Sequence, residues 1–454
     1  MTKEPLELAL RVLETHSLCD HCLGRQFGWL GTAMTNEERG RSMKLVLTLR
    51  ADYKLRSGET AAGSQILRTL AGNGMFAPAR ELSRRNAIEF PAITECHICT
   101  ISGISIFLRL QDMVTKCVDS LRGIEFDNFL VGSIPPPALA EREDELKASF
   151  GLIHGETLRS HINRELGKRL GEVINKPVEF RRPHVVLVYD VQNDSVNVQI
   201  SPLFVSGRYR KLQRGIPQSR WDCKACRGKG CDECGHTGRR YPDSISEYIG
   251  EPIREASSGT SFKFHAAGRE DVDALMLGDG RPFVVEVTEP RIRSLNLAEI
   301  ATNINTRASG KIEVDHLEFS DRQQSQVLKM ASSTNVKEYR ALIEVEHELS
   351  DEALSLAESG LSGTVIEQRT PLRVLHRRSD RVRKKTIYEV RLVRQGGPRL
   401  EGFFKVQGGT YVKELISGDE GRTRPSVAEL LGVKTRCVEL SVVAIRDQDS
   451  DHNT

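Results

Sequence analysis

The stretch that decides the fold of this chain is HAAGREDVDALMLGDGRPFVVEV, residues 265–287. It begins with the acidic turn 268–273, and a glycine turn at Asp279-Gly280 then precedes the almost wholly apolar strand 283–287. The sequence therefore predicts that Asp271 is a loop carboxylate positioned by a buried strand. The alternative is a solvated acidic turn, which is the commoner case for an isolated segment of this composition.

Length and composition indicate a water-soluble protein of several domains. The 454 residues are enough for two or three domains, and 39% hydrophobic with 28% charged residues is typical of globular chains. No apolar run approaches the roughly 20 residues of a membrane span, and the acidic, helix-patterned start is not a targeting peptide. A net charge of +3 does not by itself indicate a polyanionic partner. We expect a cytoplasmic protein.

Cysteine spacing predicts two structural zinc sites. Of the ten cysteines, eight form four Cys-x-x-Cys pairs, which in a long chain without a secretory signal favours metal binding over disulfides. Two unrelated redox or buried pairs are the alternative for the first site, whereas the second packs four thiolates and several glycines into one compact segment. The expected ligands are Cys19, Cys22, Cys96 and Cys99 at one site and Cys223, Cys226, Cys231 and Cys234 at the other. Cys117 and Cys437 are expected to be free thiols.

The middle of the chain has an α/β pattern followed by a basic segment. Helices are expected at 141–149 and 157–174, and strands at 184–191 and 195–202 are joined by a turn at Asn193-Asp194. The segment 205–221 then carries five basic residues, two aromatics and no acid, a mixture suited to phosphate contact and base stacking. A solvated basic loop is the alternative.

The C-terminal half predicts a further α+β region. We expect helices at 291–303, 351–359 and 428–433, a helix beginning at 411–415, and strands at 312–319, 339–346, 386–393 and 437–445, with a frayed tail at 447–454. The run 369–385 holds eight basic residues and one acid, which indicates a long hairpin arm whose charge suits a groove in folded RNA. A disordered, solvated loop is the alternative for this run.

Several of these motifs resemble one family. Gly268-Arg269-Glu270-Asp271-Val272-Asp273, followed by Gly280-Arg281-Pro282-Phe283, resembles the motif of the archaeal-type tRNA pseudouridine synthases that act on positions 54 and 55 of the TΨC arm. Lys337-Glu338-Tyr339-Arg340 resembles the second motif of such enzymes, and Gly409-Thr410-Tyr411-Val412-Lys413 the third.

A second resemblance covers the segment before these motifs. Residues 162–167, 182–184 and 204–212 are similar to a THUMP domain, an RNA-binding module of tRNA-modifying enzymes. The chain is therefore expected to contain an N-terminal zinc-knuckle region at 1–120, a THUMP-like domain at 121–222, a second four-cysteine motif at 223–240 and a catalytic domain at 241–454. The implied fold class is α+β, with a mixed or antiparallel central sheet in the catalytic domain.

The family resemblance also implies roles for individual residues. Asp271 would be the nucleophile, attacking either C1′ of the sugar or C6 of the uracil. Tyr339 would stack on the uracil, and Lys413 would keep Asp271 ionised. Arg269 would contact a phosphate or displace a base during nucleotide flipping. The residues expected to bind the tRNA are Arg269, Tyr339, Tyr411, Arg208, Arg210, Lys211, Arg377, Arg378 and Arg381.

No organic cofactor is expected, because the chain has neither a G-x-G-x-x-G after a strand nor a Walker lysine motif. The alternatives are another THUMP-containing tRNA-modifying enzyme that transfers a methyl group or sulfur, and a non-catalytic zinc-containing tRNA-binding protein. The second cysteine segment also resembles the cysteine-rich region of DnaJ-type chaperones, but the chain lacks the His-Pro-Asp of a J-domain.

Overall fold

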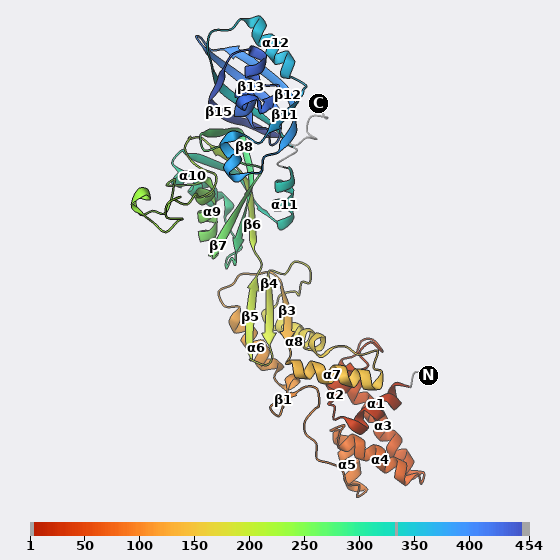
Figure 1. Ribbon diagram of the computed structural model, residues 1–454. Helices are drawn as coiled ribbons and strands as arrows, with labels where there is room; N and C mark the ends of the chain where they lie inside the picture. The colour runs from red at the N-terminus through yellow and green to blue at the C-terminus, as the bar shows by residue number, and fades with distance from the viewer. Residues whose placement is uncertain (1–3, 332–334, 447–454) are drawn as a thin grey trace. The chain divides into compact units, whose positions relative to one another are not determined.

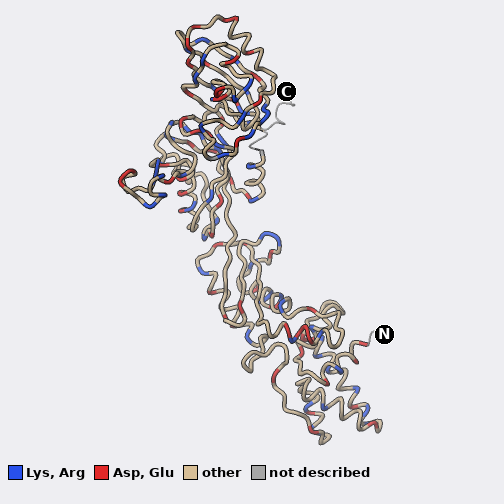
Figure 2. Tube along the Cα trace, viewed as in Figure 1, with Lys and Arg blue, Asp and Glu red and all other residues tan. Residues whose placement is uncertain are grey.

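The computed structural model describes residues 4–331 and 335–446, so the tail that we expected to fray lies outside the described residues. The chain divides into two units, Met1–Ser201 and Pro202–Thr454, each with its own sheets and hydrophobic core (Figure 1). Figure 2 shows acidic and basic residues interspersed over both units, in keeping with the small net charge. No helix among the described residues is long and apolar enough to cross a membrane.

The first unit begins with a group of helices. Their buried apolar residues, such as Val12, Leu47 and Leu67, belong to one core cluster. Thr35 begins the longest of these helices with a capping box, in which its hydroxyl accepts from the backbone of Glu38 and the Glu38 carboxylate accepts in return. The helices are α1 (Pro5–Thr15), α2 (Asp20–Arg25), α3 (Asn36–Arg56), α4 (Thr60–Ala71) and α5 (Ala77–Arg85).

The α/β pattern expected in the middle of the chain is present in the second part of this unit. β3 pairs parallel with β4, and β4 pairs antiparallel with β5 through the expected turn, where Asp194 has a positive φ. Alternate residues of β4 are buried, and Ile162 and Leu166 of α8 belong to the same cluster. The elements are β1 (Thr100–Ile101), β2 (Ile104–Ser105), α6 (Leu110–Ser120), β3 (Phe129–Ile134), α7 (Pro137–Phe150), α8 (Leu158–Ile174), β4 (Val185–Asp190) and β5 (Ser195–Ile200).

The second unit is built on a mixed sheet of ten strands, as expected for an α+β catalytic domain. Its order is β14-β11-β12-β13-β10-β15-β8-β6-β9, with β7 paired to β8, and all neighbours are antiparallel except β15 and β8. The strands are β6 (Leu203–Lys211), β7 (Ser261–Ala266), β8 (Ala274–Thr288), β9 (Ile312–Ser320), β10 (Val336–Val345), β11 (Val365–Arg369), β12 (Val382–Arg394), β13 (Arg399–Gln407), β14 (Thr423–Arg424) and β15 (Thr435–Arg446).

Strand β8 joins the two halves of this sheet. It pairs with β15 at 274–276 and with β6 and β7 through 281–288. The prediction of a turn at Asp279-Gly280 is wrong. Strand β8 continues through these two residues, and Gly278 and Gly280 have positive φ. A Cβ at Gly278 would meet the carbonyl oxygen of Val443 at 1.9 Å, so only glycine lets the two backbones approach this closely.

Helices cover each half of the sheet over a separate core. Ile249 of α9 and Ile304 of α10 share a core with β6, β8 and β9, whereas Leu354 of α12 and Leu415 of α13 pack with β10–β13. The helix expected at 291–303 begins later, because the Asn296 side chain caps it by accepting from the backbone of Glu299. The helices are α9 (Ile245–Ala256), α10 (Leu297–Ala308), α11 (Arg322–Ala331), α12 (Asp351–Leu361), α13 (Val412–Ser417) and α14 (Val427–Leu431).

The segment 204–212, which we assigned to the THUMP-like region, instead lies in the sheet of the second unit. As strand β6 it pairs with both β8 and β9. The physical reason is its alternating pattern, since Val205 and Tyr209 are fully buried in the core that contains Phe283 and Val285. The units therefore divide at 201/202, upstream of the boundary at 222/223 that we expected.

Candidate active site

Six of the residues singled out in the sequence line one cavity of the second unit. Its volume is about 310 Å³, and it lies where the loop before β8 faces β10, the 370–381 connection and the start of α13. Trp221, Lys337, Arg373 and Val374 also line it. The six residues are Arg269, Asp271, Tyr339, Arg378, Tyr411 and Lys413.

The loop that carries Asp271 is anchored by a buried ion pair. Arg281 Nε lies 2.8 Å from Glu270 Oε2, and both side chains are 1% exposed. The hydroxyl of Tyr209 donates to the Glu270 carboxylate at 2.9–3.0 Å, and Arg281 also donates to the carbonyl of Ala267 at 2.6 Å. The residue immediately before Asp271 is thus fixed to β6 and β8, which leaves the Asp271 carboxylate facing the cavity.

Lys211, at the end of β6, also holds the loop that carries Asp271. We expected it to bind RNA, but it is fully buried, and its ammonium donates to the carbonyls of Val272 at 2.7 Å and Asp271 at 3.3 Å. Burial lowers the pKa of Lys211 to about 8. Because β6 is a central strand, alternate residues point into the core, and Lys211 is one of them. It therefore positions the Asp271 backbone and is not available to the solvent.

The two arginines of β6 are also engaged within the sheet. Arg208 donates to the carbonyls of Asp279 and Gly280 at 2.5 and 3.0 Å, which fixes the irregular part of β8. Arg210 pairs with Glu313 at 3.1 Å and Asp315 at 2.9 Å on β9. These contacts tie β8, β6 and β9 together, so the structure gives both side chains a structural use that the basic composition of the segment did not indicate.

The carboxylate of Asp271 has two cationic partners. Arg373 NH1 donates to Asp271 Oδ1 at 3.1 Å, and Lys413 Nζ lies 3.6 Å from Asp271 Oδ2. Lys413 is closer to Asp273, whose two oxygens it contacts at 2.7 Å each. These contacts lower the pKa of Asp273 against the opposing effect of burial. Arg373 is therefore the nearer partner of Asp271, and sequence reasoning missed it.

Arg373 is itself fixed by a second carboxylate. Its Nε lies 2.6 Å from Glu414 Oε1, and its NH2 lies 3.4 Å from Glu414 Oε2. Glu414 is only 4% exposed. Partial burial disfavours the charge of Arg373, but Glu414 and Asp271 outweigh it and raise the pKa of Arg373. One permanently charged guanidinium thus bridges Asp271 and the start of α13.

Two tyrosines line the cavity near Asp271. Tyr339 comes from β10, and burial raises the pKa of its hydroxyl to about 12, so it is a neutral phenol at physiological pH. The hydroxyl of Tyr411 accepts a hydrogen bond from Arg378 NH1 at 3.0 Å. A neutral aromatic ring beside a paired carboxylate suits a planar, uncharged base.

Trp221 also lines the cavity, which the sequence did not predict. Its ring lies 5.1 Å from the Arg269 guanidinium and 5.3 Å from that of Arg240, and it meets Tyr241 edge-on. The backbone of Arg240 also donates to the Trp221 carbonyl at 2.9 Å. Arg269 is therefore held by a cation–π contact at the base of the second cysteine segment.

The basic run 369–385 is a hairpin, as expected. β11 and β12 pair antiparallel, and their connection contains the short helix η3 (Leu372–Arg377). Arg378 and Arg381 are exposed, whereas the side chain of Arg377 lies outside the described residues. The hairpin therefore presents charge to the solvent while Arg373 points to Asp271.

Each expected cysteine set comes together in space. In both sets the four sulfur atoms lie within 4.8 Å of one another. The Cys19–Cys99 separation is 3.6 Å, and three pairs in the second set are 3.7–3.9 Å apart. Tetrahedral zinc with Zn–S bonds of about 2.3 Å requires sulfur atoms about 3.8 Å apart. Both sets therefore fit a four-coordinate metal ion.

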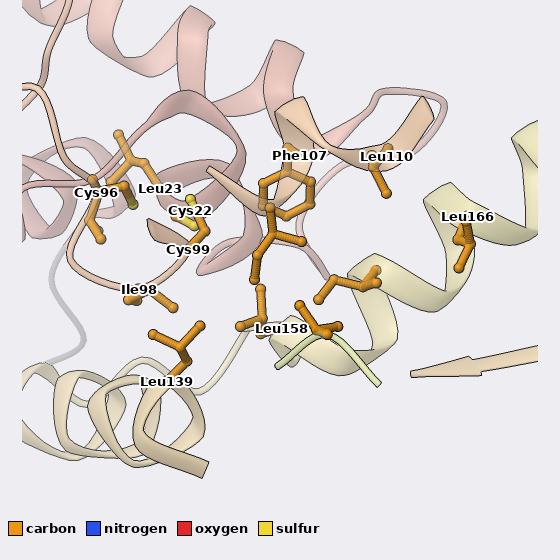
Figure 3. Packing of buried hydrophobic residues seen from close by; sticks show 14 of the residues in the cluster. Cys22, Leu23, Cys96, Ile98, Cys99, Phe107, Leu110, Leu139, Leu158 and Leu166 are labelled. Carbon is orange, nitrogen blue, oxygen red and sulfur yellow. The ribbon is translucent and has the colours of Figure 1, made fainter. Parts of the chain in front are cut away.

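The surroundings of the first set fit a charged metal–thiolate centre. Cys22, Cys96 and Cys99 lie within the hydrophobic cluster of the first unit, beside Leu23 and Ile98 (Figure 3). The fully buried guanidinium of Arg25 approaches Cys22 Sγ at 3.8 Å and Glu143 at 3.1 Å. A buried cation here offsets the negative charge of thiolates.

Comparisons with known proteins show that the chain that forms this sheet and cavity is a pseudouridine synthase, and they identify its kind. The family profile "Pus10, C-terminal" matches residues 204–446, and the profile "Pus10 THUMP domain, archaeal" matches residues 113–190. The chain is 44% identical over 440 residues to a tRNA pseudouridine synthase Pus10 of Methanothrix thermoacetophila, covering 97% of this chain and 94% of the relative. The corresponding protein of Methanocaldococcus jannaschii is 39% identical, with 96% and 94% coverage. The chain belongs to the Pus10 family of tRNA pseudouridine synthases.

Arg373→Ala should lower the single-turnover rate with saturating tRNA by about 10- to 100-fold, the effect of losing one charge-assisted hydrogen bond of about 1.5–3 kcal/mol. Arg373→Lys should recover part of the rate, because a lysine keeps the charge but lacks the planar guanidinium whose separate nitrogens contact Asp271 and Glu414. The matched control is Arg369→Ala, in the same basic run but paired with Asp380. Equal saturating rates for the two alanine variants would exclude a role for Arg373 at Asp271.

Proposed function

We propose that this protein isomerises uridine to pseudouridine at positions 54 and 55 in the TΨC arm of tRNA, with Asp271 as the nucleophile. The observation that supports this most directly is the placement of the Asp271 carboxylate in one cavity with the Tyr339 ring, between the cations Arg373 and Lys413. Membership of the Pus10 family supports the reaction class, and the choice of positions and of nucleophile is our own inference from the motifs.

Three operations are needed to convert uridine into its C-glycoside. Asp271 attacks C1′ of the sugar or C6 of the uracil, the N-glycosidic bond breaks, and the turned uracil bonds to C1′ through C5 as the carboxylate is released. Tyr339 stacks on the uracil while it is detached, and Arg373 and Lys413 hold the Asp271 carboxylate in position. Arg269, held against Trp221, contacts the displaced strand when the target nucleotide flips out.

The remaining modules supply RNA binding. The THUMP domain and the exposed arginines of the 370–381 connection would contact the tRNA away from the reacting base. No organic cofactor takes part in this isomerisation, because no electrons or groups are gained or lost. We place the enzyme in the cytoplasm, where its cysteines remain reduced.

Both cysteine sets would hold structural zinc. Four thiolates leave no open coordination position, so the ions would stabilise the fold rather than take part in the reaction. Purified protein should contain about two zinc ions per chain, and exchanging Cys231 and Cys234 for serine should reduce this to about one. Metal analysis by mass spectrometry measures both values. Fewer than one zinc ion in the unaltered protein would contradict the assignment.

Exposed arginines of the hairpin should contribute to tRNA affinity rather than to chemistry. Replacing Arg378 and Arg381 with alanine should weaken tRNA binding and reduce the slope of log K against log salt by about one to two, since each phosphate contact releases counterions. Arg436→Ala is the control, because this exposed arginine of β15 pairs with Glu344 outside the cavity. An unchanged slope across a salt titration would show that the hairpin does not contact phosphates.

The decisive test of the proposed function is Asp271→Asn. This change keeps the shape of the side chain but removes the nucleophilic charge, so pseudouridine formation should be abolished while tRNA binding and metal content persist. The readout is pseudouridine mapped on an unmodified tRNA transcript. Tyr339→Phe should retain more activity than Tyr339→Ala, because stacking needs only the ring.

Asp273→Asn provides the internal control for the position of the nucleophile. It removes the closest partner of Lys413 but leaves Asp271 and Arg373 in place, so its effect should be mild. Lys413→Ala should also be less severe than Asp271→Asn. If Asp273→Asn is inactive and Asp271→Asn is not, the nucleophile is Asp273.

A further inference from the structure

One buried lysine of the cavity has no part in the scheme above. Lys337 is 5% exposed and lines the same cavity as Asp271 and Tyr339. It stands two residues before Tyr339 on β10, and side chains two apart on a strand share a face. Lys337 thus extends the wall on which Tyr339 would hold the uracil.

The ammonium of Lys337 lies over the loop that carries the nucleophile. A Cβ built at Gly268 would lie 2.8 Å from Lys337 Nζ and 3.2 Å from Arg281 Nη1, which places both cationic groups directly beside this loop. Within the described ranges 4–331 and 335–446, Lys337 Nζ has neither a hydrogen-bond acceptor nor an ion-pair partner. A buried ammonium without a partner is costly unless the group can lose its charge.

The electrostatic surroundings favour that loss of charge. Burial is the main cause that lowers the pKa of Lys337 to about 7. The positive charges of Arg281 on β8 and Lys385 on β12 act in the same direction, and Glu270 opposes them. Of the other charged residues of the loop 268–273, Arg269 lies over the Trp221 ring, Asp271 is paired with Arg373 and Asp273 with Lys413. At neutral pH a substantial fraction of Lys337 is therefore a free amine.

Pseudouridine formation requires a base, whichever atom Asp271 attacks. Carbon C5 of uridine carries a hydrogen, and in pseudouridine that position is bonded to C1′. Tyr339 is a weak candidate to deprotonate C5, because its phenol stays protonated, and the Lys413 ammonium is engaged with two carboxylates. An amine with a pKa near the working pH is the efficient choice for such a step.

We propose that Lys337 is a catalytic residue, the base that removes the C5 proton after the new carbon–carbon glycosidic bond has formed. At that stage C5 is bonded to both C1′ and hydrogen, and the ring has an N1=C6 double bond. Lys337 Nζ takes the hydrogen as a proton, and the C5–H electron pair becomes the C5=C6 bond. The N1=C6 pair moves to N1, which takes a proton from water, so the product is a neutral isomer.

This inference rests on the proposed function, and a fluorinated substrate separates the two. In a tRNA transcript made with 5-fluorouridine, C5 bears fluorine and has no proton to lose, but every step up to carbon–carbon bond formation remains possible. Lys337→Met removes the amine and keeps the length of the side chain. Mass spectrometry of digested nucleosides measures the single-turnover loss of uridine and of 5-fluorouridine. The loss of uridine includes removal of the C5 proton, whereas the loss of 5-fluorouridine does not.

Lys337→Met should convert uridine about 10²- to 10⁴-fold more slowly, the usual contribution of a general base, yet consume 5-fluorouridine at the unaltered rate. A normal rate with uridine, or equal losses with both substrates, would overturn the proposal, since equal losses indicate a positioning role. Asp271→Asn should consume neither uridine nor 5-fluorouridine. If this variant still consumes both substrates, the assignment of Asp271 as the nucleophile is wrong. Lys263→Met, an exposed lysine of β7, should match the unaltered enzyme with both substrates.

The pH dependence and a charged replacement give a second readout. The unaltered enzyme should convert uridine faster as the pH rises through about 7, because the amine is active and the ammonium is not. Lys337→Met should lack this rise. Lys337→Arg keeps a permanent charge and should be as slow as Lys337→Met. Recovery of the rate by Lys337→Arg would mean that the positive charge is what matters, and the assignment of a base would be wrong.

Discussion

The active-site loop depends on the buried ion pair between Glu270 and Arg281. Removing two charges from water is costly, and it is tolerated here because the pair is 2.8 Å apart and Tyr209 and the Ala267 carbonyl satisfy further hydrogen-bonding groups. Loss of either partner would leave an uncompensated buried charge at a cost of about 3–5 kcal/mol. The pair links β8 to the residue before Asp271, so the position of the carboxylate is set by the central sheet rather than by the loop itself.

A second chain of charges connects this loop to distant parts of the sequence. Arg373 reaches Asp271 from the 370–381 connection and Glu414 from α13, while Lys413 bridges Asp271 and Asp273. Since Arg373 lies in the hairpin that also exposes Arg378 and Arg381, a displacement of the hairpin by RNA would act directly on the partner of the carboxylate. The arginines proposed to bind RNA and the proposed nucleophile Asp271 are therefore connected through Arg373.

The sequence predicted those features that depend on local spacing, and it failed where burial decides. Asp271, Tyr339 and Lys413 stand in short motifs, and both cysteine sets follow ligand spacing, so each could be found without coordinates. Arg373 could not, because nothing local distinguishes it among the eight basic residues of the run 369–385. Lys211 was misassigned for the opposite reason, since its basic segment is a central strand whose alternate side chains point inwards. Strand order, which places β6 beside β8, is not encoded in any local pattern.

The cations of the site also divide by chemistry in a way that only the structure reveals. Arg281 and Arg373 contact carboxylates directly, and a guanidinium cannot lose its proton in a protein, so these two positions keep their charge under all physiological conditions. Lys211 and Lys337 are buried, and no carboxylate among the described residues forms an ion pair with either of them. Burial lowers the pKa of Lys211 to about 8 and that of Lys337 to about 7. Lys211 donates to two backbone carbonyls, which a neutral amine can also do, whereas Lys337 meets the cavity. Cations of fixed charge thus contact Glu270 and Asp271, and Lys337, whose charge can change, lines the same cavity as Asp271 and Tyr339.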